Sequence, residues 1–116
     1  MDVDVVRLDQ AVEECNLLKL DVQGYELPVL KGAEGLLGGV HLIYTEIHIY
    51  PNYAEATRFH ELFGWLVDHG FDIYGIYTTY GDADGQWTQG DAIFISNELR
   101  KRKLDSDREY RCVRYV

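Results

Sequence analysis

The spacing of apolar residues changes period at Tyr25, and this change constrains the fold more than any other feature of the sequence. Residues 17–22 form a short apolar run that stops at Gly24, which is typical of a mostly buried strand. After Tyr25 the apolar residues fall on one stripe of a helix, with Pro28 in its first turn and a glycine pair at 38–39 as its end. A strand followed directly by a helix indicates a parallel α/β sheet.

The same alternation continues along the chain to Ser96. We expect a strand at 42–49, a helix at 54–69 and a strand at 71–79. A loop at 80–90 and a last strand at 91–96 should follow. A short strand at 3–6 and a small helix at 9–14, capped by Asp9, are expected before them. Because no helix separates the last two strands, they should pair as a hairpin. The sequence therefore predicts a mostly parallel α/β sheet ending in an antiparallel hairpin.

Charge is distributed unevenly over the 116 residues, whose net charge is −9. Residues 1–99 hold four basic and seventeen acidic side chains, whereas the remaining residues hold seven basic and three acidic ones. An acidic body repels phosphate, so we expect no nucleic acid as a partner. We divide the chain into a domain at 1–97 and a charged tail at 98–116, and expect the tail to be a solvated terminal helix or a frayed end.

Composition also limits the location of the protein. No stretch of 18 apolar residues occurs, so no membrane span is expected, and the acidic N-terminus does not resemble a secretory signal. We therefore expect a cytoplasmic protein. Cys15 and Cys112 fit no metal-binding or redox spacing, and both are predicted to be reduced.

The run LLKLDVQGYELPVLKGA at residues 17–33 resembles the signature of the FkbM family of methyltransferases. That signature is a strand ending in Lys-hydrophobic-Asp-Val, an acidic or amide residue, Gly, a variable residue, Glu and then Val-Leu-Lys-Gly-Ala. Three later segments agree with the family in order and spacing, at 43–47, 69–71 and 90–94. The resemblance covers about residues 6–97, and Gln23, where an acidic residue is commoner, is the one departure inside the first block.

The resemblance implies the C-terminal half of a Rossmann-like class I methyltransferase fold. It also implies S-adenosylmethionine as the methyl donor and a hydroxyl of a small molecule, such as a polyketide or a sugar, as the acceptor. The eleven glycines contain no G-x-G pair, and residues 1–16 leave no room for three preceding strands. We therefore expect an O-methyltransferase fragment that lacks the Gly-rich donor-binding half and is inactive alone. The alternative is a non-catalytic remnant that serves as a binding or assembly module.

Acidic side chains follow two of the expected strands, where sites in open α/β sheets are found. Asp21 ends the first of these strands, and Glu46 stands near the end of the next. Both are predicted to be catalytic, by orienting the reactants or accepting the hydroxyl proton. The resemblance further implies that Gln23 and Gly24 shape the loop that faces the donor.

Glu26 and His48 are predicted to lie on the substrate side of this site. The dipole of the following helix would favour Glu26 in its first turn even without a functional role. Glu46 and His48 could instead join Asp21 as a metal cluster, but nothing in the sequence fixes a third ligand, so no metal is predicted. The other histidines, and the aspartates of the last loop, are expected at the surface, in caps or in a turn: His41, His60, His69, Asp82 and Asp84.

The family's strand order, fourth-fifth-seventh-sixth, makes both right-handed crossovers run in the same direction. Both helices should therefore cover one face of the sheet and leave the other face bare. The apolar strand at 17–22 should also form an unprotected edge. A partner would cover such surfaces, and we expect either a homo-oligomer, most simply a dimer, or a separate N-terminal half.

Overall fold

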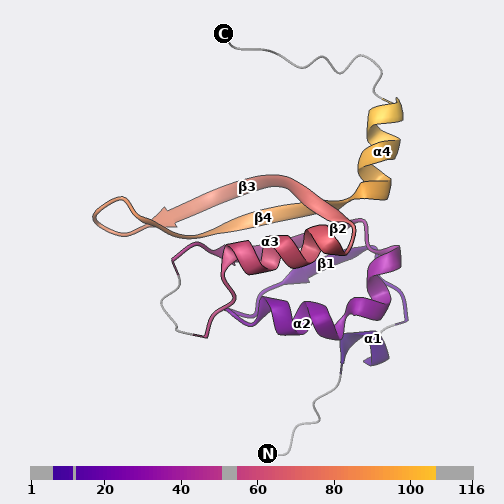
Figure 1. Ribbon diagram of the computed structural model, residues 1–116, viewed down its shortest axis with the longest axis horizontal. Helices are drawn as coiled ribbons and strands as arrows, with labels where there is room; N and C mark the ends of the chain where they lie inside the picture. The colour runs from indigo at the N-terminus through magenta and orange to yellow at the C-terminus, as the bar shows by residue number, and fades with distance from the viewer. Residues whose placement is uncertain (1–6, 12, 51–54, 107–116) are drawn as a thin grey trace, which may run out of the picture.

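The computed structural model describes residues 7–11, 13–50 and 55–106, which fold around one four-stranded sheet (Figure 1). The elements are, in order, α1 (Leu8–Ala11), β1 (Leu17–Leu20), α2 (Glu26–Gly32), the 3₁₀-helix η1 (Glu34–Gly39), β2 (Leu42–His48), α3 (Phe59–Asp68), β3 (Phe71–Gly81), β4 (Trp87–Ser96) and α4 (Asn97–Ser106). The strand expected at 3–6 lies outside the described residues.

The strands lie in the order β1-β2-β4-β3, as the resemblance implied. β1 pairs parallel with β2, but β4 lies between β2 and β3 and is antiparallel to both. The prediction of a mostly parallel sheet is therefore wrong for this chain, because inserting one reversed strand between two others makes two of the three pairings antiparallel. The coarser prediction of a mixed α/β fold is confirmed.

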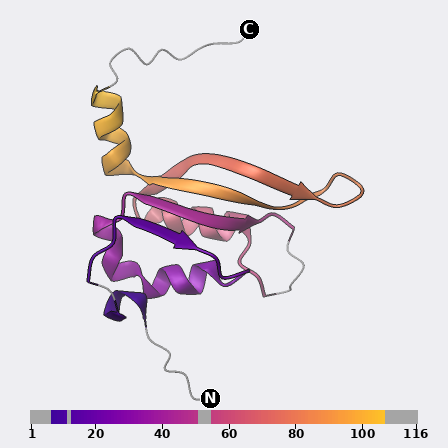
Figure 2. The ribbon, with the colours of Figure 1, turned by 180° about the vertical axis from the view of Figure 1, so that it is seen from behind.

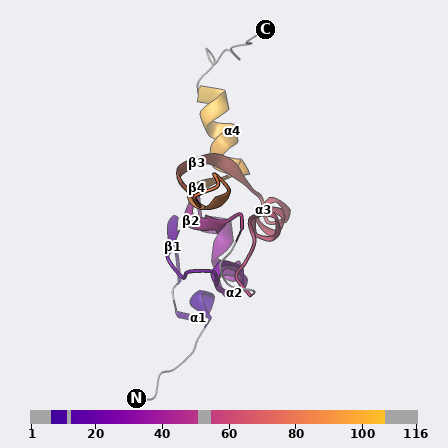
Figure 3. The same ribbon diagram turned by 90° about the vertical axis from the view of Figure 1, so that its left-hand side faces the viewer.

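Helices α2 and α3 cover the same face of the sheet, as Figure 3 shows from the side. Alternation along the strands aims Ile43 and Phe94 at this face, where both are fully buried with Leu30 of α2 and Leu66 of α3. The rest of the core comes from the same two layers. The placement of both helices on one face therefore follows the prediction.

The opposite face carries no helix across its strands in the described part of the chain (Figure 2). Leu17 is 63% exposed there, and Tyr44 and Ile93 are partly exposed beside it. The Lys19 ammonium lies 5.5 Å from the centre of the Tyr44 ring, close enough for a cation–π contact. The part of this face around Leu17, Tyr44 and Ile93 is apolar, with Lys19 as the charged group on the edge strand β1.

The helix expected to continue to Leu37 ends instead at Gly32. From Ala33 onward the backbone makes i→i+3 hydrogen bonds, with the Leu36 N–H donating to the Ala33 carbonyl at 2.8 Å, and the 3₁₀-helix η1 follows. The sequence of η1, EGLLGG, explains the change, because three glycines in six residues have poor α-helix propensity.

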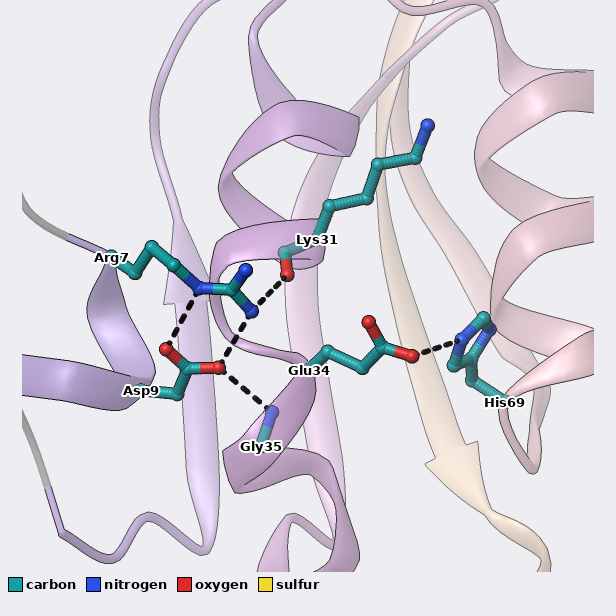
Figure 4. Close-up of polar contacts among 6 residues, drawn as sticks. All are labelled: Arg7, Asp9, Lys31, Glu34, Gly35 and His69. Atoms are coloured by element: carbon teal, nitrogen blue, oxygen red, sulfur yellow. Dashed lines mark hydrogen bonds and ion pairs between the residues drawn. The ribbon is translucent and has the colours of Figure 1, made fainter.

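Polar contacts fasten α1 and α3 to η1 (Figure 4). We expected Asp9 to cap a helix at 9–14, but it lies inside α1. Its carboxylate accepts hydrogen bonds from the Arg7 guanidinium and from the Gly35 N–H. Both donors stabilise the charged form and lower the pKa of Asp9, the Arg7 contact contributing most. On the other side of η1, Glu34 lies 3.2 Å from His69 Nε2.

The last two strands extend further into their connection than the sequence indicated. β3 continues to Gly81 and β4 begins at Trp87, so the loop expected at 80–90 is reduced to a five-residue turn. Asp82 Oδ1 accepts the N–H groups of Asp84 and Gln86, which is the chemistry of a turn, as predicted. The hairpin projects well beyond the rest of the sheet in Figure 1.

Helices α3 and α4 differ in how closely they follow the ranges expected from the sequence. α3 starts at Phe59 after extended Arg58, later than the predicted residue 54, which itself lies outside the described residues. α4 forms at the start of the charged tail, of which residues 107–116 lie outside the described residues, and Arg100 joins it to Asp72 of β3 at 2.7 Å. Among the described residues, no helix has the length and apolar character needed to cross a membrane.

A matched pair of glycine substitutions tests this backbone. Gly24 has φ +102°, and a Cβ there would lie 3.0 Å from Ala56 Cβ, so Gly24→Ala should lower the free energy of unfolding by about 1–3 kcal/mol. Gly64 is inside α3 with open space beside it, and Gly64→Ala should raise that free energy by about 0.5–1 kcal/mol. Urea unfolding followed by circular dichroism measures both. Equal stability of Gly24→Ala and the parent would contradict the described turn.

Candidate functional site

The loop after β1 turns sharply and positions the residues of the family-like motif. The Tyr25 N–H donates to the Val22 carbonyl at 3.2 Å, and Gln23 and Gly24 have φ values of 45° and 102°. Asp21 and Gln23 are exposed, whereas Gly24 is buried against Ala56. The missing side chain of Gly24 is thus required by packing inside the chain, and a role for Gln23 and Gly24 at the donor stays a prediction.

The carboxylate of Glu26 is fully buried at the start of α2. Its Oε1 accepts the Gly24 N–H at 3.0 Å and lies 3.2 Å from His48 Nε2. Its Oε2 is buried and has no hydrogen-bond partner among the described residues. The segment before α3 completes the support: the Thr57 N–H donates to the Gly24 carbonyl, and Thr57 Oγ1 accepts the Leu27 N–H.

Glu46 and His48 reach the same place from the end of β2. They are two residues apart, so strand alternation puts both on the face opposite the helices. His48 is 6% exposed, and Glu46 is partly buried. One ligand atom from each of Glu26, Glu46 and His48 lies within 4.8 Å of those of the other two. We call these three residues the edge cluster, because they meet at the carboxyl ends of β1 and β2.

Further carboxylates surround the edge cluster. Asp91 of β4 stands directly opposite Glu46 in the antiparallel pairing, where side chains on one face are neighbours. Burial raises the pKa of Glu46, and the negative charges of Glu26, Asp91 and Asp21 raise it further, while His48 opposes them. A carboxyl group with a raised pKa is a better proton acceptor than an ordinary exposed one.

The structure therefore brings together the side chains of three of the six residues singled out from the sequence, and the backbone N–H of a fourth, Gly24. Glu26, Glu46 and His48 are in contact range, while Asp21 is exposed and acts on Glu46 through its charge. The metal alternative weighed from the sequence used Asp21, whereas the geometry puts Glu26 in that position. Sequence reasoning missed Asp91, because its place opposite Glu46 depends on the β2–β4 register.

His69, His60 and Cys15 lie outside the edge cluster, and their contacts are with neighbouring residues of the fold. His69 is the C-terminal cap of α3; its Nδ1 lies 2.7 Å from the Trp65 carbonyl, and the two rings are stacked. His60 is exposed beside Glu61. Cys15 is a free thiol whose Sγ lies 3.1 Å from the Leu17 carbonyl, as expected for a reduced residue, while Cys112 lies outside the described residues.

The sheet order is the one that the family resemblance implied, and acidic side chains lie at the carboxyl ends of two parallel strands, where sites in open α/β sheets are found. The family model described as the methyltransferase FkbM domain matches residues 1–73. The chain therefore belongs to the FkbM methyltransferase-domain family. No curated protein and no solved structure matches the chain.

The raised pKa of Glu46 predicts a pH-dependent gain in stability on its removal. Glu46 holds its proton more tightly in the folded protein than in the unfolded chain. The stability that this group contributes is therefore complete below the pKa of an ordinary glutamate. It is lost as the pH rises through the higher pKa that Glu46 has in the folded protein. Glu46→Gln should therefore raise the Tm at pH 7 by a few degrees and leave it nearly unchanged near pH 4. Thermal melts at both values provide the measurement.

Glu61→Gln serves as the control, because Glu61 is exposed on α3 and outside the edge cluster. It should change the Tm equally little at both pH values. A Glu46→Gln protein that melts below its parent at pH 7 would show that ionised Glu46 stabilises the fold.

Proposed function

We propose that this chain is the acceptor-side half of an S-adenosylmethionine-dependent O-methyltransferase that acts on a hydroxyl of a small molecule. The observation that carries the proposal is Glu46, a partly buried carboxyl with a raised pKa at the carboxyl end of β2 in an FkbM-family chain. The edge cluster and Asp91 surround this carboxyl, so a hydroxyl placed beside it meets a proton acceptor in a partly desolvated site.

The described residues offer one edge of a donor site. The exposed Gln23 lies beside a hollow of about 180 Å³ that is also lined by Tyr25, Glu55 and Ala56. Whole small-molecule sites usually span about 300–1,000 Å³. The remaining contacts to the donor would come from the donor-binding half, in keeping with the absence of a G-x-G pair from this sequence.

The donor, when bound, supplies a methyl group on a sulfonium sulfur that leaves with its electron pair. The work of this chain is to hold the acceptor hydroxyl in line and to take its proton as the new oxygen–carbon bond forms. Glu46 accepts that proton, and His48, beside Glu26 and close to Glu46, orients the group. Asp21, the other residue of the predicted catalytic pair, is exposed at the end of β1, and its negative charge helps to raise the pKa of Glu46.

A partner would complete the structure on the bare face. The described β1 is an edge strand, and Leu17, Tyr44 and Ile93 leave apolar surface beside it. These features support pairing with a donor-binding half, and equally support a homodimer in which a second copy covers the face. They also favour the second candidate function, a non-catalytic assembly module, if no donor binds to any completed form.

Calorimetric titration with S-adenosylmethionine tests the proposal. The chain alone should bind with a dissociation constant weaker than about 1 mM, whereas its fusion to the N-terminal half of an FkbM domain should bind at about 1–10 μM. Glu46→Gln in the fusion should keep this affinity and lower the transfer of labelled methyl groups to a hydroxyl panel by about 10²–10⁴-fold.

The Glu61→Gln fusion should match its parent in binding and transfer. Low-micromolar binding by the chain alone would overturn the half-site proposal. Transfer by Glu46→Gln within threefold of the parent would remove Glu46 from the catalytic role, and a fusion that binds no donor would favour the assembly module.

A further inference from the structure

One carboxylate oxygen of the edge cluster lacks a partner in the described chain. Glu26 is fully buried, and its Oε2 has no hydrogen-bond partner among the described residues, although its Oε1 has two polar neighbours. A buried carboxylate oxygen without a partner is costly, and such groups are normally satisfied by a proton donor or a cation. The carboxyl group that carries this oxygen lies where two other ligand-type side chains, Glu46 and His48, converge.

The spacing of the three side chains suits a single ion. Glu26 Oε1 and His48 Nε2 are 3.2 Å apart, and neighbouring ligands on one ion with bonds of about 2.1 Å lie about 3 Å from each other. The ligand atoms of all three residues are within 4.8 Å of one another. Glu46 is partly buried rather than packed in the core.

The charges around the edge cluster also favour a cation. Three carboxylates, Glu26, Asp91 and Asp21, repel the negative charge of Glu46. Of the groups that affect the pKa of Glu46, only His48 favours its charged form. Four acidic groups thus face one imidazole at the edge cluster. A divalent ion would neutralise the negative charge of these groups and would give Glu26 Oε2 a partner.

We propose that Glu26, Glu46 and His48 bind one divalent transition-metal ion of the Mn²⁺ or Zn²⁺ class. Two carboxylates and an imidazole form a mixed oxygen and nitrogen ligand set, whereas Mg²⁺ and Ca²⁺ prefer oxygen ligands alone. Three protein ligands leave coordination positions open for water or for an oxygen of a bound molecule. The proposal rests on the contacts of these three residues and does not depend on methyl transfer; Glu46 is a ligand while the ion is bound and a proton acceptor when it is not.

Titration of the chelator-treated full chain with MnCl₂ tests the site, with the electron paramagnetic resonance signal of free Mn²⁺ as the readout. We expect one bound Mn²⁺ per chain. Glu46→Gln and His48→Gln should each weaken binding by at least about tenfold, and an equal concentration of Mg²⁺ should not displace the ion. Glu55→Gln, which changes an exposed carboxylate outside the edge cluster, should bind as the parent does.

Circular dichroism of each variant shows whether it is folded, and Glu46→Gln is decisive because its side chain is only partly buried. No saturable Mn²⁺ binding by the parent would overturn the proposal. So would equal affinity in the parent and in Glu46→Gln, because the ion would then be bound elsewhere. Displacement by equimolar Mg²⁺ would overturn the assignment of the His48 nitrogen as a ligand.

Discussion

The buried carboxylate of Glu26 joins the three segments from which the candidate site is built. It accepts the Gly24 N–H of the loop after β1, begins helix α2, and lies beside His48 at the end of β2. Because β1 and β2 are parallel, their carboxyl ends meet at one edge of the sheet, and Glu26 ties the loop to that edge. The positions of Glu46 and of the sharp turn at Gly24 both follow from this arrangement.

Much of the fold follows from local sequence patterns, because apolar periodicity reports directly which side of an element is buried. The strands at 17–20 and 42–48 and the helix ending at Asp68 were predicted on this basis, within a few residues at their ends. The 3₁₀ character of residues 34–39 was missed, since glycine content changes the backbone without changing the apolar stripe. The predominance of antiparallel pairs was missed although the strand order was expected, because the reversed last strand lies inside the sheet and pairs with β2 as well as with its hairpin partner β3.

The candidate site was predicted less completely than the fold. Positions at strand ends singled out Asp21 and Glu46, and this criterion ranked the exposed Asp21 above Glu26, which is buried in the first turn of α2. The contact between Glu26 and His48 joins residues 22 positions apart. Such a contact, like the cross-strand pairing of Glu46 with Asp91, depends on register and loop geometry that no single segment encodes.

A double-mutant cycle between Glu26 and His48 tests most directly whether this contact organises the site. Unfolding free energies of Glu26→Gln, His48→Gln and the double variant give the coupling between the two side chains. The contact at 3.2 Å between two buried groups predicts a coupling of about 0.5–3 kcal/mol. Single effects that add to within about 0.3 kcal/mol would contradict the account, because the two residues would then act independently.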